Sequence, residues 1–216
     1  QGLQRIPGKT FHWSGKYGYD LNEAQTLDTQ LNVLLEFKPE LPAAYRNTDV
    51  LFLANIDPEL QLQVLDQVEK PRLTACDSMN FWISSKPEAL QEVMKRVDIV
   101  VINEGEARLL TGESNLVMAA RQIISLGCKR LVVKRGEYGV LMFTKDSVFA
   151  APAWPLEEVF DPTGAGDTFA GGFMGYLANT GDFSEDGMRQ ALVFGSVMAS
   201  FNVEDFSLNR MKRLTY

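Results

Sequence analysis

Short apolar runs alternate with segments of helical pattern through the middle of this 216-residue chain. A short apolar run is typical of a strand that is buried on both of its faces. Strand–helix–strand alternation predicts a mainly parallel sheet with helices on both sides, because neighbouring parallel strands must be joined by a crossover. The predicted parallel strands are Val50–Ala54, Leu73–Cys76, Ile99–Ile102 and Leu131–Val133.

Residues that favour helix ends delimit the segments between these strands. Asp57 and Pro58 are typical of an N-cap and a first helical residue, and Gly127 of the position just after a helix. The predicted helices are Glu59–Val68, Pro87–Arg96, Asn115–Leu126, Gly166–Ala178 and Ser184–Ser200, the last with Ser184 as its N-cap. Two further runs, Gly139–Phe143 and Ser147–Ala150, predict an antiparallel hairpin at one edge of the sheet.

The beginning of the chain differs from the rest, because it is rich in glycine, aromatic and polar side chains. This composition predicts strands and turns that lie outside the main sheet. We therefore expect two parts, a β segment over residues 1–36 and an α/β domain over residues 37–216.

Composition excludes several classes of protein. Hydrophobic residues make up 45% of the chain and charged residues 23%, which is typical of a folded globular protein. The formal net charge of −7 disfavours binding to nucleic acids or anionic membranes, and the longest apolar runs are too short to span a bilayer. Cys76 and Cys128 have no metal-ligand spacing and are expected to be buried reduced thiols, and the single His12 excludes a His-rich metal site.

The strongest local signal is the run Asp161-Pro162-Thr163-Gly164-Ala165-Gly166-Asp167-Thr168-Phe169. Its small residues lead directly into a predicted helix, so a ligand can approach their N–H groups, and the helix N-terminus favours an anion there. An aspartate inside such a site repels a bare phosphate, but it can take the proton from a hydroxyl group that attacks a phosphoryl group. The alternative is that Asp167 only caps the helix, and these residues alone do not decide between the two.

Two other segments lie at predicted strand ends, where open α/β sheets bind ligands. In Asn103-Glu104-Gly105-Glu106, the asparagine can hydrogen-bond a phosphate and Glu106 can hold Mg²⁺ directly or through water. Lys134-Arg135-Gly136-Glu137-Tyr138-Gly139 forms a turn after the next strand. Taken alone, each segment is better explained structurally, the first as an acidic loop that caps a short helix and the second as a glycine turn with solvated charges.

Two common phosphate-binding motifs do not match the sequence. Gly8-Lys9-Thr10 resembles the end of a P-loop, but Leu3 stands where the first glycine belongs, and the segment has no strand-to-helix context. A dinucleotide fingerprint that starts at Gly164 would need a third glycine at the position of Phe169.

Together, the three segments resemble the ribokinase (PfkB carbohydrate kinase) family. Asp161–Phe169 is similar to the family's C-terminal signature, and Asn103 with Glu106 matches its Asn-x-x-Glu motif. The Gly136 turn matches the segment that borders the family's nucleotide site, and the resemblance covers residues 36–216 well and the first 35 residues loosely. It implies a ribokinase-like three-layer α/β/α sandwich with a mostly parallel sheet, in which residues 1–36 form part of a small β lid.

The resemblance also implies a role for each matching residue. Asp167 is implied to be the catalytic base, and the backbone amides of Gly164, Ala165 and Gly166 are implied to form the anion hole. The implied nucleotide-binding residues are Asn103, Lys134, Gly136, Gly139 and Ser196, with Ser196 either lining the adenine pocket or only packing between helices. Glu106 is implied to hold Mg²⁺, and Asp161 with the Thr163 carbonyl to hold a monovalent cation such as K⁺.

The chain also departs from the family pattern in three places. Asn202-Val203-Glu204-Asp205 lacks the glycine that is usual near the cation site, and Met79 and Phe81 replace the expected residues in the loop after Asp77. The family's first βαβ region, which supplies most contacts with the acceptor, has no counterpart here. We therefore expect this chain to be the C-terminal portion of a longer protein.

The function that the resemblance implies is an ATP-dependent kinase that uses Mg²⁺ and phosphorylates a hydroxyl of a sugar or sugar-like small molecule. Two alternatives remain open, a nucleoside kinase of the same fold and a non-catalytic protein that binds a nucleotide or a sugar. The expected partners are the small-molecule substrate and, through the lid, a second copy of the chain. Binding to nucleic acid or to a membrane is not expected, and the expected location is the cytoplasm.

Overall fold

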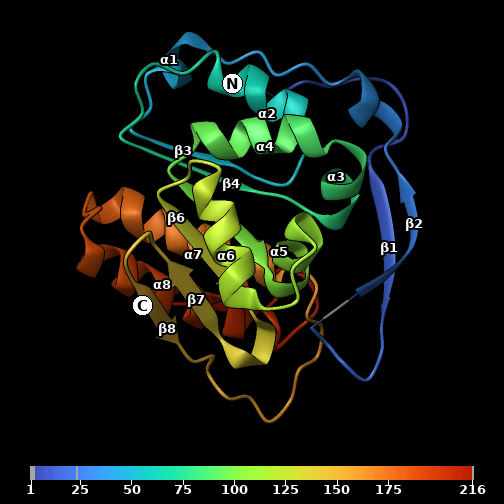
Figure 1. Ribbon diagram of the computed structural model, residues 1–216. Helices are drawn as coiled ribbons and strands as arrows, with labels where there is room; N and C mark the ends of the chain where they lie inside the picture. Colours follow the sequence, from blue (N-terminus) through green and yellow to red (C-terminus); the bar gives the residue numbers. More distant parts are fainter. Residues whose placement is uncertain (1–2, 23, 216) are drawn as a thin grey trace.

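The computed structural model describes residues 3–22 and 24–215, and its main feature is a six-stranded sheet with helices on both faces (Figure 1). The strands follow one another across the sheet in the order β3-β4-β5-β6-β7-β8. Their bounds are β3 Val50–Leu53, β4 Leu73–Asp77, β5 Ile99–Asn103, β6 Arg130–Lys134, β7 Val140–Phe143 and β8 Val148–Ala151. The predicted three-layer α/β/α architecture is confirmed.

Strands β3 to β6 are parallel, whereas β7 runs antiparallel to β6 and β8 runs antiparallel to β7. The four predicted parallel strands and the predicted hairpin therefore all occur, with ends that differ by a single residue. Strands β7 and β8 are joined by a tight turn in which the Thr144 amide donates to the Ser147 carbonyl at 2.9 Å. This hairpin forms one edge of the sheet, as expected.

The helices that connect the parallel strands pack against one face of the sheet. Each crossover steps in the same direction, and right-handed crossovers then put all of their helices on the same side. In this core, Val100 and Ile102 of β5 meet Leu90 and Met94, and Ile123 lies with them. The helices are α2 Pro58–Leu65, α3 Asn80–Ser85, α4 Pro87–Arg96, α5 Glu104–Thr111 and α6 Leu116–Ser125, and a short α1, Ala43–Arg46, precedes β3.

The opposite face of the sheet is covered by α7, Ala165–Thr180, and α8, Glu185–Asn202, which follow the last strand (Figure 1). Ile99 and Val101 alternate with their neighbours along β5 and therefore point to this side, where they pack with Phe173 and Leu177. Both helices were predicted. Ser184 caps α8 by accepting a hydrogen bond from the Gly187 amide at 3.2 Å.

A separate two-stranded antiparallel sheet, β1 His12–Tyr17 and β2 Ala24–Gln30, stands to one side of the main sheet (Figure 1). A bulge between Ser14 and Gly15 interrupts its register, and the short 3₁₀ helix Asn32–Glu36 follows it. The prediction of strands outside the main sheet is confirmed. The division into a β lid at 1–36 and a domain at 37–216 stays a prediction.

Two helical predictions differ from the structure. The helix expected over Glu59–Val68 ends at Leu65, because the Gln67 side chain instead bonds the Pro39 carbonyl at 2.7 Å and the Leu41 amide at 2.9 Å. Helix α3 was not predicted, since it spans only six residues and owes its position to the buried side chains of Trp82 and Ile83. Tertiary contacts override the local pattern in both places.

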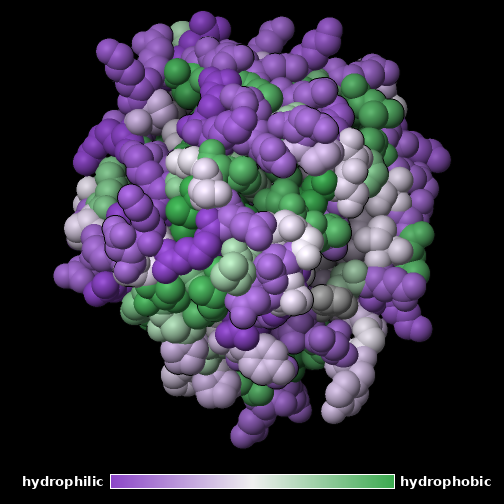
Figure 2. Space-filling view, viewed as in Figure 1, coloured by the Kyte–Doolittle hydropathy of each residue, from purple (hydrophilic) through white to green (hydrophobic). Residues whose placement is uncertain are grey.

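The molecular surface agrees with the composition. The face drawn in Figure 2 is largely hydrophilic, with apolar side chains gathered near its middle. Cys76 and Cys128 are free and buried, as expected, and burial raises the pKa of both thiols, that of Cys128 to about 11. Among the described helices, none combines the length and the apolar character that a membrane span needs.

Helices α7 and α8 approach each other closely at two glycines. A Cβ atom at Gly195 would lie 2.8 Å from the Phe169 carbonyl oxygen, and one at Gly172 would lie 2.9 Å from Met198 Cγ. Gly175, on the exposed side of α7, has no neighbour within 4 Å of such an atom. The close approach therefore depends on the missing side chains at Gly172 and Gly195.

We predict that Gly195→Ala lowers the free energy of unfolding by about 1–3 kcal/mol, the usual cost of overpacking a core. The matched control, Gly175→Ala, should raise it by about 0.5–1 kcal/mol, because alanine favours a helix over glycine. Urea unfolding followed by circular dichroism measures both. A Gly195→Ala protein as stable as the wild type would contradict this account of the α7–α8 contact.

Candidate active site

Three neighbouring parallel strands end in polar or charged residues at one edge of the sheet. Strand β4 ends at Asp77, β5 at Asn103 and β6 at Lys134. Asn103 lies directly opposite Lys134 in the β5–β6 register, and Asp77 lies opposite Val101 in the β4–β5 register. The carboxyl edge of such a sheet is where open α/β folds bind ligands.

Lys134 and Asp77 form an ion pair at this edge. The Nζ atom of Lys134 lies 3.2 Å from Asp77 Oδ2, and only 17% and 5% of the two side chains are exposed. The second carboxylate oxygen of Asp77 accepts a hydrogen bond from the Ser78 amide at 2.7 Å. The interpretation of Lys134 as a solvated charge in an ordinary turn is therefore wrong.

Burial acts on both members of this pair. Burial alone would lower the pKa of Lys134, but the carboxylates of Asp77, Glu106 and Asp167 outweigh it and raise that pKa above its ordinary value. Burial also raises the pKa of Asp77, although Lys134 and the Ser78 amide act in the opposite direction. The lysine is therefore a firmly protonated ammonium group surrounded by acidic groups.

Asn103 and Glu106 form a capping box at the start of α5. Asn103 Oδ1 accepts from the Glu106 amide and Glu106 Oε2 accepts from the Asn103 amide, both at 2.7 Å. The structural alternative, a solvated acidic loop that caps a short helix, is therefore right about the cap but not about solvation, because Glu106 is buried. Burial raises the pKa of Glu106 to about 7, with Asp77 adding to the increase against the opposing effects of Lys134 and the Asn103 amide.

Helix α7 begins with a glycine and leaves Asp167 free. Gly164 is the N-cap, with a φ of +83° that favours glycine, and no side chain caps the helix. Asp167 lies in the first turn and is exposed, and no residue in 3–22 or 24–215 donates a hydrogen bond to its carboxylate. The alternative in which Asp167 caps the helix is therefore wrong.

The backbone amides at the start of α7 are not equally available. The Ala165 amide donates to the Pro162 carbonyl at 3.1 Å. The amides of Gly164 and Gly166 have no such acceptor in the part of the chain that the structure describes. Of the three amides predicted to form an anion hole, two are therefore open, and the Ala165 amide is already engaged.

Lys134 also lies against this turn. A Cβ atom at Gly166 would be 3.1 Å from Lys134 Nζ, so the ammonium group occupies space that a side chain at residue 166 would need. The sequence suggested that small residues here let a ligand approach the N–H groups, and the structure adds a second reason, the close approach of Lys134. The edge of the sheet and the start of α7 thus meet at Lys134.

The glycines of the predicted nucleotide turn have structural reasons of their own. Gly136 has a φ of +53°, and a Cβ atom there would lie 1.6 Å from Asn22 Oδ1, which accepts from the Glu137 amide at 3.2 Å. Gly139 has a φ of +87°, and a Cβ atom there would lie 2.1 Å from the Ala151 carbonyl oxygen. Packing therefore explains both glycines, and a nucleotide role for them stays a prediction.

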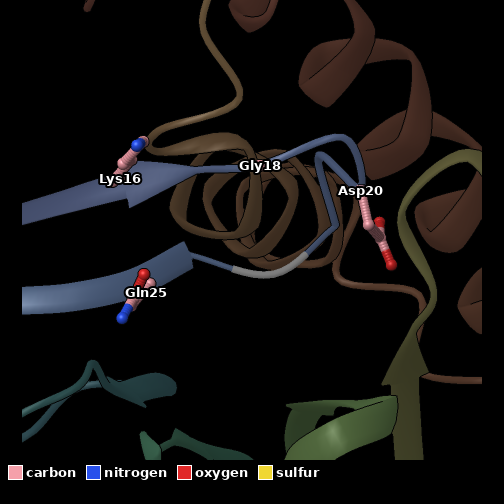
Figure 3. Close-up of a pocket in the computed structure, with 4 residues that line it drawn as sticks. All are labelled: Lys16, Gly18, Asp20 and Gln25. Atoms are coloured by element: carbon pink, nitrogen blue, oxygen red, sulfur yellow. The ribbon is translucent and has the colours of Figure 1, made fainter.

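The β1–β2 hairpin reaches both turns of the site. Its end carries Asn22, which contacts the Gly136 turn, and Tyr17, whose hydroxyl oxygen accepts from Thr163 Oγ1 at 3.3 Å. Figure 3 shows this end of the hairpin in front of a helix seen end-on, with a hollow lined by Lys16, Gly18, Asp20 and Gln25. The pattern of the sequence did not indicate these contacts, which join residues far apart in the chain.

The predicted monovalent-cation residues are tied to α8 by Asn202. This asparagine is 1% exposed, donates from Nδ2 to the Thr163 carbonyl at 3.0 Å, and accepts from Thr168 Oγ1 at 2.8 Å. Asp161 Oδ1 in turn accepts from the Thr163 amide at 2.9 Å. One hydrogen bond occupies each of these oxygens and leaves further lone pairs free, and a monovalent cation at Asp161 and the Thr163 carbonyl stays a prediction.

Ser196 is set apart from these contacts. It is half-buried on α8, beside the exposed Val193, Phe194 and Val197, and its hydroxyl has no hydrogen bond to the described residues. The structure brings together Lys134, Asp77 and the start of α7, and it does not join Ser196 to them. Two further residues are buried parts of the site, Asn202, which the sequence marked as a departure from the family pattern, and Asp77, whose loop departs from that pattern only at Met79 and Phe81.

Comparisons with known proteins agree with this architecture. A model of the family described as pfkB family carbohydrate kinase matches residues 17–213. A cytidine kinase from Thermococcus kodakarensis is 36% identical over 179 residues, which cover 80% of this chain and 63% of that protein. The chain therefore spans less than two thirds of the length of that relative.

Solved structures of the same fold resemble the chain at lower identity. The adenosine kinase of Sinorhizobium meliloti superposes with a TM-score of 0.71 at 22% identity, covering 87% of this chain and 59% of that one. The aminoimidazole riboside kinase of Salmonella enterica, in complex with aminoimidazole riboside and an ATP analogue, gives a TM-score of 0.63 at 21% identity, covering 75% and 58%. At these identities the likeness shows the fold alone.

We predict that Asn202→Leu destabilises the protein by about 1–3 kcal/mol, because it leaves the part-buried Thr163 carbonyl and Thr168 hydroxyl without their partner. The control on the same helix, Ser196→Ala, removes a hydroxyl that has no such partner and should change stability by less than about 0.5 kcal/mol. Urea unfolding curves measure both. Equal effects of the two changes would contradict the structural role of Asn202.

The raised pKa of Glu106 predicts how the free energy of unfolding depends on pH. Its pKa is about 7 in the folded protein and 4.5 in the reference state, so between these values the folded protein keeps a proton that the unfolded chain has lost. The stability that Glu106 contributes is therefore complete below pH 4.5 and is lost as the pH rises through 7. Glu106→Gln keeps the cap but cannot ionise.

The free energy of unfolding of Glu106→Gln, relative to the wild type, should accordingly rise by about 2–3 kcal/mol between pH 5 and pH 8. Denaturant titrations at the two pH values measure the difference. The exposed Glu88 supplies the control Glu88→Gln, whose stability should follow the wild type at both. A difference for Glu106→Gln that stays constant with pH would refute the prediction.

Proposed function

This chain belongs to the pfkB family of carbohydrate kinases, and we propose that it transfers the γ-phosphoryl group of ATP to a hydroxyl of a sugar or nucleoside. One observation above all supports the proposal. The Asp167 carboxylate is exposed in the first turn of α7, beside the open amides of Gly164 and Gly166. A free base next to an anion site is what phosphoryl transfer to a hydroxyl requires.

In the proposed reaction, Asp167 accepts the proton of the acceptor hydroxyl. The hydroxyl oxygen forms a bond to the γ-phosphorus while the bond from that phosphorus to the β–γ bridging oxygen breaks. The products are a phosphate ester and ADP, and Asp167 later releases the proton to water. The amides of Gly164 and Gly166 and the positive end of α7 stabilise the charge on the transferring group.

The few acidic residues at the site suit a magnesium ion whose other ligands are the phosphates of the nucleotide. No group of three metal-ligand side chains occurs among residues 3–22 and 24–215, and Mg²⁺ commonly uses one or two carboxylates together with substrate phosphates. Glu106 would bind it, directly or through water, with the carboxylate oxygen that the capping box leaves free. Mg²⁺, when bound, would neutralise the charge of the phosphates. Asn103 would contact a phosphate through Nδ2, since its Oδ1 accepts from the Glu106 amide.

The remaining nucleotide contacts are part of the same proposal. Lys134 would lie beside the phosphates and the Gly136 turn beside the ribose. The adenine would lie near Ser196, where the exposed Val193 and Phe194 offer apolar surface to a base. Gly139 would act only by shaping the turn, because its close neighbour is the Ala151 carbonyl. A monovalent cation at Asp161 and the Thr163 carbonyl would be held by the lone pairs that their hydrogen bonds leave free, and no step of the mechanism depends on it.

A nucleoside is the second candidate for the acceptor. It is favoured by the cytidine kinase relative, which is 36% identical over 80% of this chain. Release of ADP measured with ribose, other free sugars and a set of nucleosides would decide between the two. Turnover with nucleosides but with no free sugar would establish the second candidate, and binding of ATP without any turnover would favour a non-catalytic protein. A cytoplasmic location and pairing of two copies through the β1–β2 hairpin belong to the proposal as well.

We predict that Asp167→Asn lowers kcat by roughly 10²–10⁴-fold, the usual scale of general-base catalysis, since asparagine cannot accept the proton. Affinity for ATP should stay the same or increase, because a negative charge beside the γ-phosphate is gone. Stability should not change, as Asp167 neither caps α7 nor forms a hydrogen bond with the described residues.

The matched control is Asp186→Asn, which removes an exposed carboxylate from the first turn of α8 and should keep full turnover. Steady-state kinetics, calorimetric ATP titration and thermal unfolding are measured on the same preparations. Wild-type turnover that survives in Asp167→Asn would exclude Asp167 as the base.

A further inference from the structure

The ammonium group of Lys134 stands at an unusual place, the positive end of a helix. It lies against Gly166, in the first turn of α7, where a Cβ atom would be 3.1 Å away. The helix dipole and the open amides of Gly164 and Gly166 make this end positive, so a cation there is electrostatically unfavourable. An anion bound between the amides and the ammonium group would be attracted by both.

Only one of the carboxylates around this cation forms a hydrogen bond with it. Asp77 Oδ2, at 3.2 Å, is the one hydrogen-bond acceptor of Lys134 Nζ among the described residues, although an ammonium group has three donors. Next to the pair, the Ser78 hydroxyl is also buried without a hydrogen-bond partner in the described chain. The edge of the sheet thus holds donors that the protein itself does not satisfy.

The charges around Lys134 keep it protonated. Asp77 on β4, Glu106 on α5 and Asp167 on α7 all raise the pKa of Lys134, and together they outweigh the lowering by burial. The neighbouring Arg135 is not available for the same task, because it pairs with Glu104 at 2.7 Å. A group that keeps its charge and has unused donors is suited to stabilise phosphoryl oxygens.

We propose that Lys134 is a catalytic residue that contacts the transferring phosphoryl group, and that Asp77 is a positioning residue that holds its ammonium group against the start of α7. This inference rests on the kinase activity proposed above. Lys134 exchanges no proton in the reaction, since the acceptor's proton goes to Asp167. As the bond to ADP breaks, the free donors of Lys134 stabilise the charge on the equatorial oxygens of the phosphoryl group.

The test must avoid leaving a buried charge unpaired. Lys134→Met alone would strand Asp77, whereas Lys134→Met combined with Asp77→Asn replaces the ion pair by a neutral pair of similar size. This double variant should lose roughly 10²–10³-fold in kcat, as expected when a donor to a developing oxyanion is removed. Its affinity for ATP should fall roughly tenfold while its affinity for ADP stays nearly constant, because only ATP carries the γ-phosphate.

Lys145→Met, which removes an exposed lysine from the turn between β7 and β8, is the control, and it should leave kcat and the ratio of ATP to ADP affinity as in the wild type. Calorimetric titration with ATP and with ADP needs no turnover. An unchanged affinity ratio in the double variant would therefore overturn the inference even if the kinase proposal holds. Wild-type protein that turns over no sugar or nucleoside would instead remove the kinase proposal itself.

The pH profile of kcat in the single variant Asp77→Asn tests the positioning role of Asp77 separately. Removing this carboxylate takes away the strongest attraction that keeps the buried ammonium charged, so the pKa of Lys134 should fall. The alkaline limb of the kcat profile should then move to lower pH, while kcat at pH 6 stays closer to that of the wild type. A profile that falls evenly at every pH would show that Asp77 acts only on folding, and would overturn its role in positioning Lys134.

Discussion

Strand β5 has buried side chains on both of its faces. Ile99 and Val101 pack against α7 and α8, and Val100 and Ile102 pack on the side of the crossover helices. A strand in this position needs a helical layer on each side, because apolar side chains on either face would otherwise meet water. The last two helices must therefore pass behind the sheet. Their route starts at the carboxyl edge of the strands, and it brings the N-terminus of α7 to the ends of β4, β5 and β6.

The charged groups at the carboxyl edge are expected to lower the stability of the fold, because they are buried. Asp77, Glu106 and Lys134 are all largely removed from water, and desolvating an ion pair can cost more than its attraction returns. Glu106 shows the cost directly, as burial raises its pKa to about 7. Groups of this kind, gathered where a helix begins, are typical of functional sites rather than of stabilising networks. In the proposed reaction, Mg²⁺ and Lys134 would offset the repulsion between these three carboxylates and the phosphates.

Sequence reasoning found the residues whose signals are local. The glycine-rich start of α7, the free Asp167 and the Asn103–Glu106 segment were all recognised, because each depends on residues a few positions apart. It did not find the Asp77–Lys134 pair, whose members are 57 residues apart, or the bond of Asn202 to Thr163 across 39 residues. It allowed Gly136 and Gly139 either a turn or a nucleotide role, but it did not show that Asn22 and Ala151 leave no room for a side chain at these positions.

The sequence by itself determined the strands of the main sheet, most helices, several of their caps and the mostly parallel direction of the strands. These follow from periodicity, from N-cap chemistry such as Asp57 and Ser184, and from the rule that parallel neighbours need crossovers. Only the tertiary structure decided which side chains meet at the carboxyl edge and where α2 ends. It also placed Lys134 Nζ close to Gly166, where a side chain would crowd it. Those outcomes depend on contacts between distant segments and on how far each charge is removed from water, and no short stretch of sequence encodes either.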